Sequence, residues 1–211
     1  TTDARQDIAR LTTAAASEIN RTLVSMDALL AELSGWSNAP QTDLARLLQA
    51  TLNSQMLLRN VALLDADHRV LASARLDALR LGVGADPAFL DSVLAQPFQA
   101  LAVSAPTQTD LAPEQLIYLA RSAPQPNGRK LLVVAEARVA ILADQLDTGD
   151  GGRSASTLEL ANGQLLAAYP PHLHTRPTLL QPPLPDVQPT IPPAAPGGAG
   201  EGHLQRVVGV P

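Results

Sequence analysis

The sequence contains no cysteine and very few aromatic residues. Without cysteine the chain can form neither a disulfide framework nor a thiolate metal site, and it has no cysteine nucleophile. Two Phe, two Tyr and one Trp leave the core to be built from Leu, Val, Ile and Ala, a composition that suits helices and small sheets.

Basic clusters and long apolar runs are also missing. The formal net charge is −5, whereas nucleic-acid binding depends on Lys and Arg that neutralise phosphates, so nucleic acid is excluded as a partner class. No apolar run reaches the roughly 18 residues of a membrane span, and the N-terminus lacks the basic and apolar regions of a signal peptide. We expect any membrane anchor of this protein to lie outside the chain.

The first strong pattern is a long amphipathic helix over residues 3–33. Its apolar residues recur every three or four positions and form one stripe, and Gly35 is expected to end the helix. Such a helix needs a domain or a partner helix to cover its stripe. We weigh both, and we favour a homodimer through its N-terminal half. A second helix is expected over residues 42–57.

A strand-turn-strand unit occurs twice. Residues 60–74 read NVALLDADHRVLASA and residues 156–169 read STLELANGQLLAAY, where Asn162-Gly163 is a strong hairpin signal. Between the two units we expect a helix near residues 88–94, strands over 115–120 and 130–137, and a helix over 139–146.

The composition changes after the second unit. Ten prolines fall between Pro170 and Pro196, and a last strand is expected over residues 205–210. We therefore expect an α+β fold in three parts: an N-terminal helical segment (1–57), a PAS-like antiparallel sheet module (58–148), and a second, smaller, incomplete PAS-like module (149–211).

This order of elements resembles the double Cache sensors, which are PAS-like extracytoplasmic domains of bacterial histidine kinases, diguanylate cyclases and chemoreceptors. The resemblance rests on the long leading helix, the unit VALLDADHRVLAS, the Asp86-Pro87 helix start and the strand ending YLAR. It implies a periplasmic domain of an inner-membrane protein that binds a small metabolite in the membrane-distal module. It also implies a helix shift that is passed to a cytoplasmic kinase or cyclase.

The same resemblance indicates a ligand site between the sheet and the segment that follows the first hairpin. Residues 85–89 are similar to the family's Asp-Arg-Pro-Tyr-Phe element, although the arginine is missing and Ala88 replaces the tyrosine. The family's amino-acid signature, an arginine followed closely by Trp and Tyr, is also missing. The expected ligand-binding residues are Arg80, Asp86, Phe89, Tyr118 and Arg121.

Each of these residues also has a structural interpretation. Arg121 either binds a ligand carboxylate through its fork or is a solvated residue at a strand end, and Arg80 either lines the pocket mouth or forms a surface salt bridge. Tyr118 either donates its hydroxyl to a ligand or is a core residue. Asp86 either accepts an ammonium group or caps the helix that begins at Pro87, and we favour the cap.

No cofactor, metal or catalytic residue is predicted. His172 and His174 form an H-x-H pair without acidic neighbours, and Asp65 with Asp67 fits a turn better than a calcium loop. No nucleophile elbow, phosphate-binding loop or zinc helix occurs.

Three functions remain open at this point. The first is a sensor of a small, carboxylate-bearing metabolite, and the second is a structural or dimerisation spacer that binds no ligand. The third is an interaction module that presents the proline-rich segment to a partner's groove.

Overall fold

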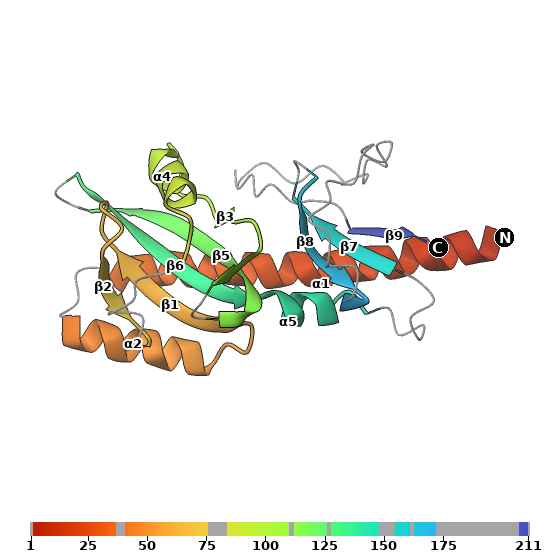
Figure 1. Cartoon of the computed structure of the whole chain (residues 1–211), viewed down its shortest axis with the longest axis horizontal. Coiled ribbons are helices and arrows are strands. Elements are labelled where there is room, and N and C mark those ends of the chain that lie inside the picture. The colour runs from red at the N-terminus through yellow and green to blue at the C-terminus, as the bar shows by residue number, and fades with distance from the viewer. Residues whose placement is uncertain are drawn as a thin grey trace, which may run out of the picture.

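One long helix runs the length of the molecule, and two antiparallel sheets pack against it (Figure 1). The computed structural model describes residues 2–36, 41–75, 84–109, 112–125, 128–147, 155–160, 163–171 and 207–210. The expected α+β class, with a long N-terminal helix that carries an antiparallel sheet, is confirmed. Within the described ranges, no helix is both long and apolar enough to cross a membrane.

The long helix, α1, spans Thr2–Gly35 and ends at the expected glycine. Its apolar residues are spaced three or four apart, so they share one face, and that face is buried at Ala15, Ile19, Leu23, Met26, Leu30 and Leu33. The second helix, α2 (Gln41–Asn53), ends before the expected Leu57. The chain turns after Asn53 because Leu57 and Leu58 are needed in the core, where both are buried.

The larger sheet follows α2 and contains six strands. Its order is β2-β1-β6-β5-β3, with β4 also paired to β5, and the pairs are antiparallel. The strands are β1 (Leu58–Leu64), β2 (Val70–Ser73), β3 (Ala102–Val103), β4 (Thr107–Thr109), β5 (Ala112–Pro124) and β6 (Lys130–Arg138). The expected strand at 115–120 is the middle of the longer β5, and the short strands β3 and β4 were not expected.

Asp65 and Asp67 belong to the turn between β1 and β2, and their hydrogen bonds show a structural role. Asp65 Oδ1 accepts hydrogen bonds from the backbone N–H groups of Asp67, at 2.9 Å, and Arg69, at 2.8 Å. His68 adopts a positive φ of 63° at this turn. The expected turn is confirmed, and in the part of the chain that the structure describes no group of three metal-ligating side chains occurs. His172 and His174 lie outside the described residues.

The two faces of the larger sheet pack against different helices. One face joins the stripe of α1 and the apolar face of α2 through Val61, Leu63, Ile117, Leu119, Val133 and Ala135. The other face packs under α4 (Pro87–Ala95) through Ala62, Leu64, Tyr118, Ala120, Leu132 and Val134. Alternate residues of a strand point to opposite faces, so the period-two pattern of each strand decides which helix a residue meets.

A short helix, α5 (Val139–Asp144), leads from β6 toward a smaller sheet. That sheet has the order β8-β7-β9 and consists of β7 (Ala155–Glu159), β8 (Leu165–Tyr169) and β9 (Val207–Val210). The second hairpin and the last strand are confirmed, and Gly163 has the positive φ, 82°, that the hairpin turn requires. The expected boundaries at residues 57 and 148 stay predictions.

Truncation of the α1 stripe is expected to destabilise the whole domain. Leu30 is 0% exposed, so Leu30→Ala should lower the free energy of unfolding by about 2–5 kcal/mol through lost burial and a residual cavity. Val24→Ala on the same helix shortens a side chain that is 59% exposed, so it should change the free energy of unfolding by less than about 0.5 kcal/mol. Urea denaturation measures both, and equal losses would contradict the assigned core face of α1.

Candidate functional site

Three polar side chains form a row across the centre of the larger sheet. Glu136 on β6 is directly opposite Asn60 on β1 and Tyr118 on β5. Tyr118 packs on the α4 side, and alternation from Ala62 and Val134 places Asn60 and Glu136 on that side as well. All three residues of this polar row are buried. Buried polar groups require partners, so the partners of each residue in the row decide whether it belongs to a site or to the ordinary core.

A row of small residues lies beside the polar row. Val134 on β6 is opposite Ala62 on β1 and Ala120 on β5, and we call these three the alanine row. Leu90 and Val93 of α4 are buried against this face, and Phe89 packs partly buried beside them. The face therefore combines an apolar floor of small side chains, an apolar helical cover and one line of polar groups.

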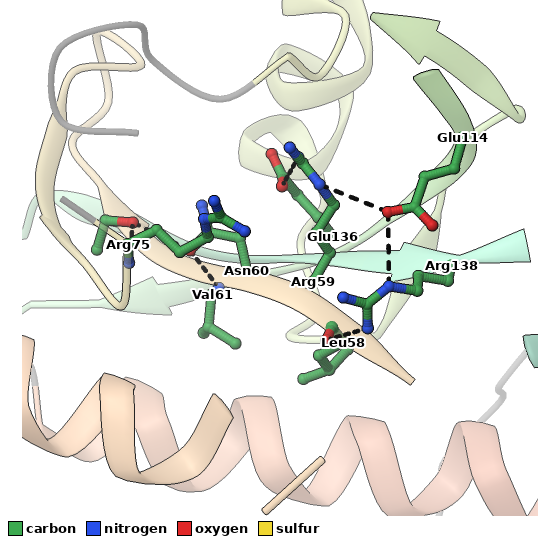
Figure 2. A network of polar contacts seen from close by, with 9 residues as sticks. Leu58, Arg59, Asn60, Val61, Arg75, Glu114, Glu136 and Arg138 are labelled. Atoms are coloured by element: carbon green, nitrogen blue, oxygen red, sulfur yellow. Dashed lines mark hydrogen bonds and ion pairs between the residues drawn. The ribbon is translucent and has the colours of Figure 1, made fainter. Parts of the chain in front are cut away.

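Arg59 neutralises the central carboxylate of the polar row. Its Nη1 donates to Glu136 Oε2 at 3.0 Å, and its side chain is only 14% exposed against 6% for Glu136. One extra residue on β1 at the shift between Leu58 and Asn60 forms a bulge, which turns Arg59 toward this face. Figure 2 shows Arg59 and Glu136 on the side of the sheet away from α1 and α2.

Two further charges continue from this ion pair. Glu114 Oε1 lies 3.6 Å from Nε of Arg59 and 3.5 Å from Nε of Arg138 (Figure 2). Arg138 Nη1 also donates to the carbonyl oxygens of Met56, at 3.0 Å, and Leu58, at 2.9 Å. We call Glu136, Arg59, Glu114 and Arg138 the charge chain.

The hydroxyl of Tyr118 is the unsatisfied group of the site. The residue is 1% exposed, and its oxygen has no hydrogen-bond partner among the residues that the structure describes. Burial and the negative charge of Glu136 raise the pKa of Tyr118 far above its usual value, although Arg59 partly opposes this. The group therefore stays a neutral phenol, which can donate one hydrogen bond and accept another.

The backbone of Tyr118 is fixed by hydrogen bonds, whereas its hydroxyl has none to the described part of the chain. Tyr118 N–H donates to Ser104 Oγ at 2.8 Å, and Ser104 N–H donates to the Tyr118 carbonyl at 2.9 Å. A buried hydroxyl without a partner is unfavourable by about 1–3 kcal/mol. A bound small molecule with a polar end would remove that penalty.

The expected site residues are only partly brought together. Tyr118 and Phe89 lie on the α4 side of the sheet. Asp86 is exposed and accepts a hydrogen bond from the backbone N–H of Ala88 at 3.0 Å, so it caps α4, as the favoured interpretation had it. Arg80 lies outside the described residues.

The expected position of Arg121 in the pocket is wrong. Arg121 is three residues after Tyr118, an odd step along a strand, and so it points to the opposite face. There its Nη1 forms an ion pair with Asp27 of α1. Arg121 thus joins β5 to the long helix and lies away from the polar row.

Sequence reasoning did not find Arg59, Asn60, Glu114, Glu136 or Arg138. The one available signal was the lone Glu136 inside the apolar run KLLVVAEA, because an isolated acid in a buried strand needs a partner. The partner depends on the pairing of β1 with β6, which are far apart in the sequence.

Comparisons with known proteins identify the fold. No protein-family model matches the sequence, and no curated protein matches it. The chain is similar to the extracellular domain of rpHK1S-Z16, a candidate histidine kinase, with a TM-score of 0.68 and 20% identity over 80% of this chain and 72% of that one. It is also similar to the ligand-binding domain of the Pseudomonas aeruginosa chemoreceptor PctC in complex with GABA, with a TM-score of 0.62 and 20% identity over 78% and 76%.

A third similar structure is the sensory domain of the Campylobacter jejuni chemoreceptor Tlp3 with isoleucine bound. Its TM-score is 0.62, and the identity is 11% over 84% of this chain and 75% of that one. At the level of the fold, these likenesses confirm the resemblance to Cache sensor domains.

Removal of the Tyr118 hydroxyl is expected to leave the ligand-free domain as stable as before. Tyr118→Phe deletes a buried group without a partner, so the free energy of unfolding should stay constant or rise by up to about 1 kcal/mol. Ser73→Ala is the matched control, because the buried Ser73 hydroxyl donates to Asn60 Oδ1 at 3.1 Å. It should lose about 1 kcal/mol in the same denaturation experiment. A comparable loss in Tyr118→Phe would show that the phenol has a partner.

Proposed function

We propose that this chain is the extracytoplasmic sensing region of a membrane-bound bacterial signal-transduction receptor. In this role it is the periplasmic part of an inner-membrane protein, it binds a small metabolite, and it passes a helix shift to a cytoplasmic kinase or cyclase domain. The observation that carries the proposal is the buried Tyr118 hydroxyl on the α4 face, for which the described residues offer no hydrogen-bond partner. The fold supports it, since the similar structures are sensory or ligand-binding domains of receptors.

The face defines the ligand that would fit. A compact apolar body would lie over Ala62 and Ala120, and its polar end would reach the Tyr118 hydroxyl. Since Arg121 is on the other face, a ligand carboxylate would have to share the guanidinium of Arg59 with Glu136. A polar end without a negative charge avoids that competition.

A spacer that binds no ligand is the second candidate function. Leu90 and Val93 of α4 are almost fully buried over this face, which is the filled pocket that a spacer predicts. In a sensor, α4 must move outward when the ligand enters. Binding therefore has to favour the opened state over the closed one, since a ligand shifts an equilibrium only by its differential affinity.

A ligand screen by thermal shift separates the two functions. Amino acids, dicarboxylates, short fatty acids, amines and purines are tested, and a ligand at 100 times its Kd should add about 2.7 kcal/mol of stability. Tyr118→Phe should raise the Kd of a ligand bound at this site about tenfold, because one hydrogen bond is lost. Arg121→Ala is the control on the opposite face and should leave the ligand's effect in place.

The outcomes are distinct. If the stabilisation by a ligand is unchanged in Tyr118→Phe but absent in Arg121→Ala, the binding site lies on the α1 face of the sheet. A screen without any stabilising compound supports the spacer.

A homodimer through α1 is part of the proposed receptor. The α1 face opposite the buried stripe carries small side chains, among them Thr13 and Ser17, together with the charged Arg10 and Arg21, and the exposed Val24 lies on it. Helices pack closely where small side chains meet, so this face suits a second copy of the same helix.

A charge on that face should prevent association. Val24→Glu is expected to raise the dimer dissociation constant at least tenfold in sedimentation equilibrium, because it places two carboxylates in one helix contact. Ala50→Glu, at an exposed position of α2, is the matched control and should leave the constant unchanged. Equal association of wild type and Val24→Glu would rule out this face of α1 as the contact.

A further inference from the structure

The charge chain joins the candidate site to the start of α5. Glu136 belongs to the polar row, and Arg59 holds it at 3.0 Å. Glu114 offers the same oxygen, Oε1, to Arg59 at 3.6 Å and to Arg138 at 3.5 Å. One oxygen shared between two guanidinium groups makes their positions interdependent.

Arg138 is the last residue of β6 and the N-cap of α5. Its backbone N–H donates to the Leu57 carbonyl at 3.0 Å, and its guanidinium donates to the carbonyls of Met56 and Leu58. The N-cap makes no side-chain hydrogen bond to α5, so these contacts, together with the burial of Val139, hold the first turn of the helix to the sheet.

From its first residue onward, α5 packs in one core with the smaller sheet as well as with the larger one. Val139, Leu142 and Ala143 are buried in the same core as Leu158 of β7 and Leu166 of β8. A displacement of the first turn of α5 therefore changes the packing of the smaller sheet, which follows α5 in the chain.

We propose that the charge chain couples the polar row to the smaller sheet, with Arg59 as the moving residue. When Glu136 is held by Arg59, Glu114 remains available to Arg138, and α5 is fixed. When a ligand forms a hydrogen bond or ion pair with Glu136, Arg59 is released and its guanidinium binds the Glu114 carboxylate with both of its forked N–H groups. Arg138 then loses its ion pair with Glu114, and the first turn of α5 loosens. This regulation rests on the proposed sensing function, but its test needs no ligand.

Glu136→Gln imitates the occupied state because it removes the charge that holds Arg59. Amide hydrogen exchange of residues 139–147 should become at least threefold faster in Glu136→Gln than in wild type. In a Glu114→Gln background the chain is already interrupted, so the further change Glu136→Gln should alter exchange there by less than about 1.5-fold. Residues 41–53 of α2, which pack under the opposite face, serve as the internal reference and should not change.

Each contrary result overturns the coupling. The proposed coupling is wrong if Glu136→Gln does not change the exchange rate of α5, or if the acceleration is the same with and without Glu114→Gln. It is also wrong if the exchange rate of α2 rises equally, since that would indicate global destabilisation. Arg59→Lys is the second variant should Glu136→Gln fail to fold, because a single ammonium group cannot bridge both carboxylates. A lysine that pairs with the nearer Glu136 leaves Glu114 wholly to Arg138, so exchange in α5 should stay within about 1.5-fold of wild type or become slower. An acceleration of twofold or more in Arg59→Lys would overturn the coupling. A failed coupling with a positive ligand screen leaves the sensor and removes only the relay.

Discussion

Both sheets of this protein depend on the buried stripe of α1. The larger sheet covers the stripe around Leu30 and Leu33, and the core that contains Ile19 also takes in Leu158 and Leu166 of the smaller sheet. Among the described residues, neither sheet has another helix of comparable length to bury its apolar face. Because the helix is continuous from Thr2 to Gly35, any change in how one sheet lies on it changes the support of the other.

The same constraint explains why the candidate site lies where it does. The α1 stripe takes the odd-numbered positions of β5, such as Ile117 and Leu119, so the even-numbered positions face the shorter α4. A helix of nine residues covers less of a sheet than a pair of longer helices does. Polar groups such as Tyr118 and Glu136 are tolerated on this side, where the ion pair with Arg59 offsets the burial of the carboxylate.

The elements with strong local patterns could be predicted from the sequence. The stripe of α1, the apolar runs of β1 and β6, and the glycine turn before β8 each depend on neighbours in the chain. Tyr118 was found through a family resemblance and is buried on the α4 side. Strands β3 and β4 were missed because two or three residues are too short to show a period, and they form only because β5 offers an edge.

The errors at the site come from register and from parity. Arg121 was expected beside Tyr118 because both match positions that face the pocket or its rim in the family it resembles, although an odd separation on a strand puts them on opposite faces. Glu136 was overlooked because its partners come from β1 and β5, and their alignment with β6 is a property of the folded sheet. The bulge that turns Arg59 toward Glu136 shifts the register of β1 against β6 by one residue, and the local sequence of β1 does not predict this shift.

The division of β5 between two faces also bears on how such a domain can diversify over evolution. Substitutions at Ile117, Leu119 or Arg121 disturb the contact with α1 and with it the stability of the fold. Substitutions at Ala120, or at its neighbours Ala62 and Val134, reshape only the surface under α4. Single substitutions on one side of the sheet can therefore change the chemistry of the surface under α4 while the contact between β5 and α1 stays as it is.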